Sequence, residues 1–187
     1  MFRISLLFLT FGLLLSCSQD EEKPMENPTQ IDTYFLLKDF VLGQIDLLDE
    51  VKVRKMTSIK GEVENTEQQM DIEDWRKELD IFIQADINKA SLATSYATEK
   101  GPDFTIHRLK PGEKSAIQEI KVAYKGDEIR QISFTSYQQN IFYTSESKGV
   151  LSVDTATGKI SSYQVSGTQK VWFLPINEIK VKGEVIA

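Results

Sequence analysis

The sequence predicts an α+β fold, in which two helices pack on one face of a curved, mostly antiparallel sheet. In the first half of the 187-residue chain, apolar residues recur at helical spacing in two stretches. After about residue 91 the chain alternates between short apolar runs and turn dipeptides such as Pro111-Gly112 and Thr157-Gly158. Helices followed by strands, without a parallel crossover, are typical of α+β proteins. We expect a meander of six to ten strands, with a half-barrel as its most curved form.

Each predicted helix begins with an aspartate and carries an apolar stripe. The first spans about residues 32–48, with Asp32 as its N-cap, and the second about residues 71–86, with Asp71 as its N-cap. The first stripe consists of Tyr34, Leu37, Val41, Ile45 and Leu48, and the second of Ile72, Trp75, Leu79, Phe82 and Ile83. Both stripes are expected to lie against the sheet.

A β-hairpin is predicted between the two helices, with strands at residues 51–59 and 62–69 and a turn at Lys60-Gly61. The return strand is so polar that we expect it at a sheet edge. The remaining strands are predicted at residues 92–98, 103–109, 115–124, 129–137, 140–147, 150–153, 159–174 and 178–186. Lys148-Gly149 is expected to separate two of these strands.

The first 17 residues have the pattern of an exported lipoprotein. Arg3 is the only charged residue before Cys17, and the apolar run of residues 4–15 is shorter than the roughly 20 residues that span a bilayer. These features predict a secretory signal peptide over residues 1–16. The segment Leu14-Leu15-Ser16-Cys17 resembles the lipobox of bacterial lipoproteins. This resemblance implies cleavage before Cys17, diacylglycerol on its sulfur, and a fatty acid such as palmitate on the new amino terminus.

The residues after Cys17 indicate the outer membrane. Ser18 stands where an aspartate would resemble the inner-membrane retention signal, and Asp20, Glu21 and Glu22 form an acidic run. This run resembles the export signal of surface lipoproteins in the Bacteroidota, although a solvated linker has the same composition. We therefore expect an outer-membrane lipoprotein, and the sequence leaves open whether it faces the periplasm or the cell surface.

A lipidated flexible tether is predicted at residues 17–30, followed by a single domain at residues 31–187. Residues 18–30 are polar and acidic and contain two prolines, which disfavours a packed core. These thirteen residues reach at most about 45 Å when fully extended.

Composition limits the partners of the chain. It has 28 Asp and Glu against 22 Lys and Arg, and one of the 22 is Arg3 of the signal peptide. An acidic balance disfavours nucleic acid and anionic lipid as partners. Cys17 is the only cysteine, so a chain lipidated there has no disulfide and no cysteine-ligated metal, and we expect no cofactor.

Part of the chain resembles uncharacterised lipoproteins of the Bacteroidota. The resemblance rests on Asp74-Trp75, Glu78-Leu79 and Phe82, together with the segments Asp86-Ile-Asn-Lys89, Ser95-Tyr96 and Gly167-Thr-Gln-Lys-Val171. It implies the same compartment and a single domain. It implies no activity.

Few residues are candidates for catalysis. His107 is the only histidine, and we expect it on the surface of a strand beside Arg108. Asp74 and Glu78 are four residues apart on the second predicted helix, and glycosidases use paired carboxylates, but solvated helix charges have the same spacing. An aromatic sheet face can bind glycan or lipid, or it can be covered by the first predicted helix, which is what we expect here. The aromatic residues of the predicted sheet are Tyr124, Tyr137, Tyr143, Tyr163 and Trp172.

The leading functional hypothesis is therefore a non-enzymatic binding or structural lipoprotein of the outer membrane. Its partners are the membrane, through the Cys17 lipid, and a protein, glycan or lipid that the sequence does not identify. The alternative is a carrier that holds a lipid or acyl chain in a half-barrel cavity. A hydrolase would require His107 or the carboxylates to meet in a pocket.

Overall fold

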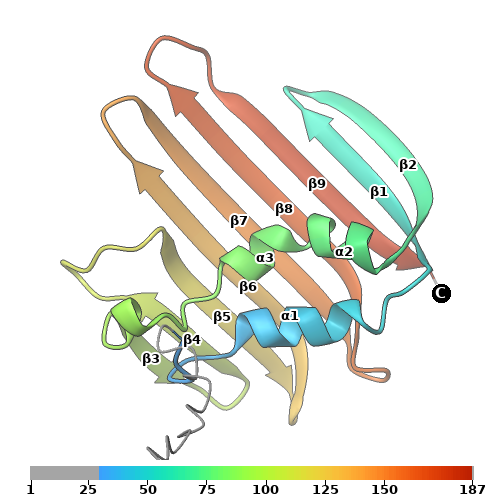
Figure 1. Cartoon of the computed structure of the whole chain (residues 1–187), viewed down its shortest axis with the longest axis horizontal. Helices are drawn as coiled ribbons and strands as arrows, with labels where there is room; N and C mark the ends of the chain where they lie inside the picture. The colour runs from blue at the N-terminus through green and yellow to red at the C-terminus, as the bar shows by residue number, and fades with distance from the viewer. Residues whose placement is uncertain (1–29, 187) are drawn as a thin grey trace, which may run out of the picture.

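The computed structural model describes residues 30–186, which form one antiparallel sheet with three α-helices on one of its faces (Figure 1). The α+β prediction is thus confirmed, with three short α-helices in place of two long ones. Residues 1–29, including Cys17 and the predicted signal peptide and tether apart from Gln30, lie outside the described part, as does Ala187.

The sheet has nine strands in the order β2-β1-β9-β8-β7-β6-β5-β4-β3. From β3 to β9 it is a meander, and the hairpin of β1 and β2 joins it because β1 pairs with β9. The strands are β1 (Val51–Ile59), β2 (Glu62–Met70), β3 (Tyr96–Lys100), β4 (Phe104–Leu109), β5 (Ile117–Lys125), β6 (Glu128–Gln139), β7 (Tyr143–Asp154), β8 (Lys159–Val171) and β9 (Asn177–Ile186). The polar strand β2 lies at an edge, as predicted.

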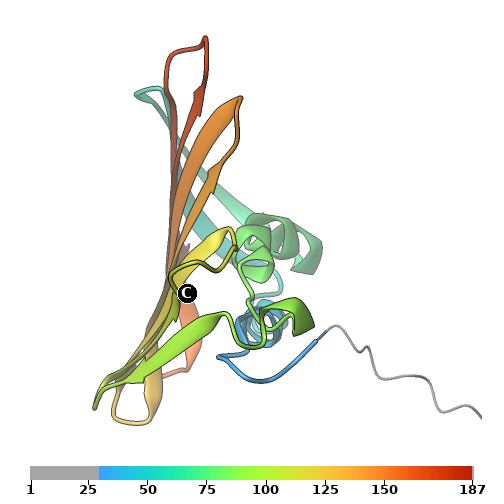
Figure 2. The ribbon, with the colours of Figure 1, turned by 90° about the vertical axis from the view of Figure 1, so that its left-hand side faces the viewer.

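The core lies between the helices and one face of the sheet, and the strands extend beyond the helices at one end (Figure 2). The predicted stripe of the first helix is buried throughout, although α1 itself spans only Leu37–Ile45. Asp32 does not cap this helix, because the N-cap is Leu36 and no side chain bonds there. Tyr34 is instead held by its own hydrogen bonds, from its backbone N–H to Asn88 Oδ1 and from its hydroxyl to the carbonyl of Leu92.

The second predicted helix is divided at Leu79 into α2 (Ile72–Glu78) and α3 (Asp80–Gln84). Asp71 is the N-cap of α2, as predicted, and its Oδ1 accepts a hydrogen bond of 2.8 Å from the Asp74 N–H. Trp75, Leu79 and Phe82 are fully buried, so the apolar stripe continues across the break.

Three strand predictions were wrong in detail. Residues 90–92 form a 3-10 helix, η1 (Ala90–Leu92), so β3 begins only at Tyr96. Strand β7 begins only at Tyr143, three residues after the predicted start, and it runs through Gly149 without a break. The rings of Phe134 and Phe82 occupy the space that a side chain would fill at Gly149, so the glycine serves packing and not a turn. Strand β8 ends at Val171, three residues before the predicted end.

Candidate functional site

Three hairpin turns lie at the end of the sheet that extends past the helices (Figure 1). The turn between β1 and β2 is joined to β9 by a hydrogen bond of 3.1 Å from Lys60 N–H to the Glu178 carbonyl. The turns after β6 and β8 are joined by a bond of 3.0 Å from Trp172 N–H to the Phe142 carbonyl. The loops 140–142 and 172–176 therefore lie side by side.

These two loops expose six large apolar side chains, which we call the apolar tip. Between 53% and 84% of the surface of each of these residues is exposed. A single exposed apolar residue is common in proteins, whereas a cluster of them is unusual. The apolar tip consists of Ile141, Phe142, Trp172, Phe173, Leu174 and Ile176. A contiguous exposed apolar patch on a folded protein commonly marks a binding surface.

The local sequence explains why residues 172–176 leave the sheet. Val171 still pairs with Tyr143 of β7, but β9 begins only at Asn177, so residues 172–174 have no strand partner on that side. Pro175 has no N–H with which to extend the ladder. The loop instead closes with a bond of 3.0 Å from Leu174 N–H to the Val171 carbonyl.

The second loop is held by one side chain. Asn140 Oδ1 accepts hydrogen bonds from the N–H groups of Phe142 and Tyr143, at 2.8 and 2.9 Å. This Asx-type turn directs Ile141 and Phe142 outward, because their backbone cannot continue the ladder of β6.

No charged residue occurs at positions 140–144 or 171–177. Charges begin at the base of the tip, with Lys170, Glu178 and Lys60. Below them, Ile59 of β1 and Ile179 of β9 are paired across the strands and are each about half exposed. The tip is thus an uncharged apolar surface bounded by a mixed ring of charges.

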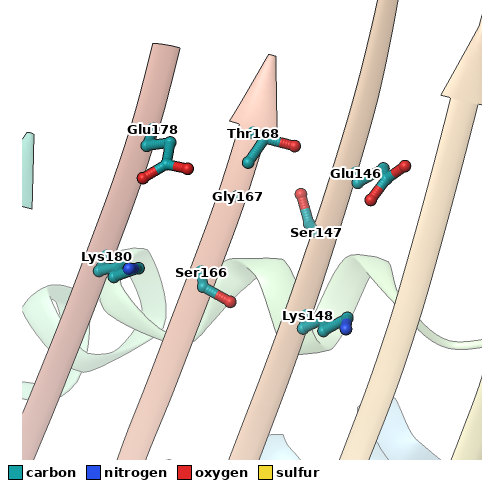
Figure 3. A pocket seen from close by; sticks show the side chains of 8 residues that line it. All are labelled: Glu146, Ser147, Lys148, Ser166, Gly167, Thr168, Glu178 and Lys180. Carbon is teal, nitrogen blue, oxygen red and sulfur yellow. The ribbon is translucent and has the colours of Figure 1, made fainter. Parts of the chain in front are cut away.

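The helix-free face of the sheet carries a shallow polar hollow of about 200 Å³ next to this ring (Figure 3). Two carboxylates flank Thr168 in one cross-strand row, and two lysines flank Ser166 in the next. The rows are Glu146, Thr168 and Glu178, followed by Lys148, Ser166 and Lys180. Opposite charges lie in adjacent rows, so the hollow has no net preference for an anion or a cation.

His107 is buried, and the prediction of a surface histidine was wrong. It lies on the helix side of β4, where its Nε2 accepts a hydrogen bond of 3.2 Å from the Phe35 N–H. Its Nδ1 therefore carries the proton and donates to Thr98 Oγ1 at 2.8 Å. Burial lowers the pKa of His107 below its usual 6.5, and the positive charge of Lys100 lowers it further. Both ring nitrogens are used within the fold.

The structure does not bring Asp74 and Glu78 together as a catalytic pair. Asp74 is half exposed and lies 3.9 Å from Lys77 Nζ. Glu78 is largely buried, where it forms an ion pair with Lys55 and accepts a bond of 2.8 Å from the Tyr163 hydroxyl. Burial and the charge of Glu78 raise the pKa of Tyr163. Glu78 thus joins α2 to β1 and β8, whereas His107 lies on β4.

The aromatic residues of the sheet are divided between core and surface. Tyr163 is covered as predicted, with its ring edge-to-face against Trp75 at 6.2 Å between centroids. Trp172 is 82% exposed, and the expectation that the helices cover it was wrong. The usable signal was the uninterrupted apolar run Trp172-Phe173-Leu174-Pro175-Ile176, which lacks the alternation of a half-buried strand.

No known protein family, curated protein or solved structure matches this chain. The resemblance to lipoproteins of the Bacteroidota therefore stays a prediction. None of the helices within residues 30–186 has the length and apolar character needed to cross a membrane. In the same range, no three metal-binding side chains lie close enough together to hold an ion.

Proposed function

We propose that the protein is a non-enzymatic binding module of the outer membrane, anchored by lipid on Cys17, and that it binds its partner through the apolar tip. The observation that carries this proposal is the exposure of six large apolar side chains on two adjoining loops. Removing apolar surface from water is favourable by roughly 25 cal/mol per Å². A partner that covers the tip would gain this free energy.

The position of the tip fits an anchored module. The first described residues enter beside the helices, where Gln30 pairs with Lys89, and lie at the other end of the domain from the tip (Figure 1). The proposed tether therefore attaches where it does not cover the binding surface.

The filled core favours this module over the carrier. A carrier would need an open apolar cavity on the concave face. That face is occupied by α1, α2 and α3, whose buried side chains form one cluster with those of the sheet. The larger hollows of the described part lie at its surface and have mixed polar and apolar walls, as in the one lined by Glu113, Lys114, Gln118 and Tyr143.

The anchor is tested by replacing the lipidated residue. We expect Cys17→Ser to leave unprocessed or soluble protein, because the thioether to diacylglycerol cannot form. Cell fractionation and mass spectrometry of the amino terminus measure this, and Ser18→Ala is the control that keeps the cysteine. A Cys17→Ser protein that stays firmly in the outer membrane would contradict the proposal.

A further inference from the structure

We infer that the apolar tip inserts into the acyl region of an uncharged lipid bilayer. This inference rests on the proposed function and names the partner of its binding surface. The other two occupants to consider are a protein partner and a second copy of the chain.

The shape of the tip suits a fluid partner. The six side chains belong to loops at the ends of hairpins, and these hairpins project beyond the helices (Figure 2). A protein partner would need a matching cavity. Stable protein interfaces involve about 20–30 residues a side, several times the number in this tip. A bilayer adapts to a protrusion and needs no such area.

Several backbone N–H groups of the tip already have hydrogen-bond partners, which a bilayer cannot provide. Unpaired N–H groups are costly in hydrocarbon. Phe142 and Tyr143 donate to Asn140 Oδ1, and Trp172 and Leu174 donate to carbonyls of the two loops. Pro175 has no N–H. This pairing lowers the cost of moving the loops out of water.

The charges around the tip set a limit to insertion. Segment 171–177 ends at Lys170 and Glu178, and Glu146 is the first charged residue after segment 140–144. Lys60 lies level with Glu178, because its N–H bonds to the Glu178 carbonyl. These charged side chains would stay in the headgroup region, while the apolar tip enters the acyl chains below it. The mixed signs and the acidic balance of the chain favour an uncharged surface.

The anchor and the tip can reach the same membrane. The predicted tether extends to at most about 45 Å. Strand β8, with 13 residues, is about 43 Å long, so the tether is comparable in length with the body of the domain.

The two tryptophans allow a direct test with the mature lipoprotein. Trp75 is fully buried in the core, whereas Trp172 lies in the tip. The purified protein is attached through its own anchor to phosphatidylcholine vesicles, with and without dibrominated acyl chains. We expect the Trp172 emission to shift to shorter wavelength on vesicles and to be quenched by the brominated chains. A Trp172→Phe protein should show neither effect.

A charge in the tip should abolish insertion. Leu174→Asp is expected to reduce the bromine quenching to the level of Trp172→Phe, while Val63→Asp, at a similarly exposed position on β2, should leave it unchanged. Equal urea midpoints for the two aspartate variants would show that the folds are comparable.

Two results would overturn the inference. The first is that Trp172 stays accessible to aqueous iodide in protein that floats with the vesicles. This result would show that the tip does not insert, and the proposed module would then require a protein or glycan partner. Protection of Trp172 without lipid, increasing with protein concentration, would show pairing of two copies. Protein that fails to float and has a free thiol at Cys17 would instead contradict the proposed function.

Discussion

An aromatic ring fills the space that a side chain at Gly183 would occupy. A Cβ at this residue would lie 2.1 Å from Cε1 of Tyr163, which is opposite Gly183 across β8 and β9. The ring cannot move aside easily, because its hydroxyl is bonded to Glu78 and its edge contacts Trp75. The same arrangement occurs at Gly149 with the ring of Phe134.

We predict that Gly183→Ala lowers the free energy of unfolding by about 1–3 kcal/mol, because the added methyl overpacks the core. Gly43→Ala is the matched control. Gly43 lies within α1 with nothing within 4 Å of its Cβ position, so alanine there should raise stability by up to about 1 kcal/mol. Urea denaturation measures both changes, and equal effects would contradict the assignment.

His107 links the segment before α1 to β4 in its neutral form only. Protonation of Nε2 would remove the acceptor of the Phe35 N–H. The pKa of His107 in the folded protein lies below the unfolded value of 6.5, so the unfolded chain binds the proton more readily. The contribution of His107 to stability is therefore fully present above pH 6.5 and is lost as the pH falls toward the folded pKa.

We predict that the stability difference between the wild type and His107→Gln decreases as the pH is lowered from 7.5 to 5. Both proteins contain the same carboxylates, so the effect of carboxylate titration on stability cancels in this difference. Urea denaturation at each pH gives the two free energies of unfolding. A constant difference would show that folding does not change the pKa of His107, and a difference that grows toward acid pH would show that folding raises it; either result would contradict the lowered pKa.

At the scale of elements, the two aspartates predicted as helix caps have different roles. Asp71 caps α2 with a side-chain hydrogen bond, whereas Asp32 lies before the first turn of α1 and bonds no amide there. We predict that Asp71→Ala costs about 1 kcal/mol of stability. Asp32→Ala should change stability by less than about 0.5 kcal/mol. Thermal or urea unfolding distinguishes them, and equal losses would be inconsistent with these capping assignments.

Local patterns predicted most of the elements correctly. The hairpin of β1 and β2 followed from alternation and from Lys60-Gly61, and the edge position of β2 followed from its polarity. The break expected at Gly149 does not occur, because that glycine serves the packing of Phe134 and Phe82 from other elements. A glycine required by a distant aromatic ring looks, in the sequence, like a glycine required by a turn.

The apolar tip was not predicted, for a similar reason. The alternation of Gln169, Val171 and Phe173 before Pro175 predicts a strand that continues to residue 174. Whether a residue lies in a sheet depends on where its neighbour begins, and β9 begins at Asn177. The joining of loops 140–142 and 172–176 depends on contacts that are distant in sequence.

At the scale of the whole molecule, the two faces of the sheet differ. One face is covered by helices and contains the core, with Trp75, Leu79 and Phe82 at its centre. The other carries rows of serine, threonine, lysine and glutamate such as Lys148, Ser166 and Lys180 (Figure 3). The apolar tip, with the three most exposed large apolar side chains of the described residues, lies at one end, so the domain presents its main apolar surface in one direction.

The place of β9 in the sheet also affects when the domain can be completed. The hairpin of β1 and β2 is synthesised early, yet its neighbour in the sheet is β9, whose residues 177–186 leave the ribosome more than a hundred residues later. Pairings between such distant segments form slowly. A nascent chain would thus stay open until almost all of it has emerged, and this would suit the export through a translocation channel that our proposed outer-membrane location requires.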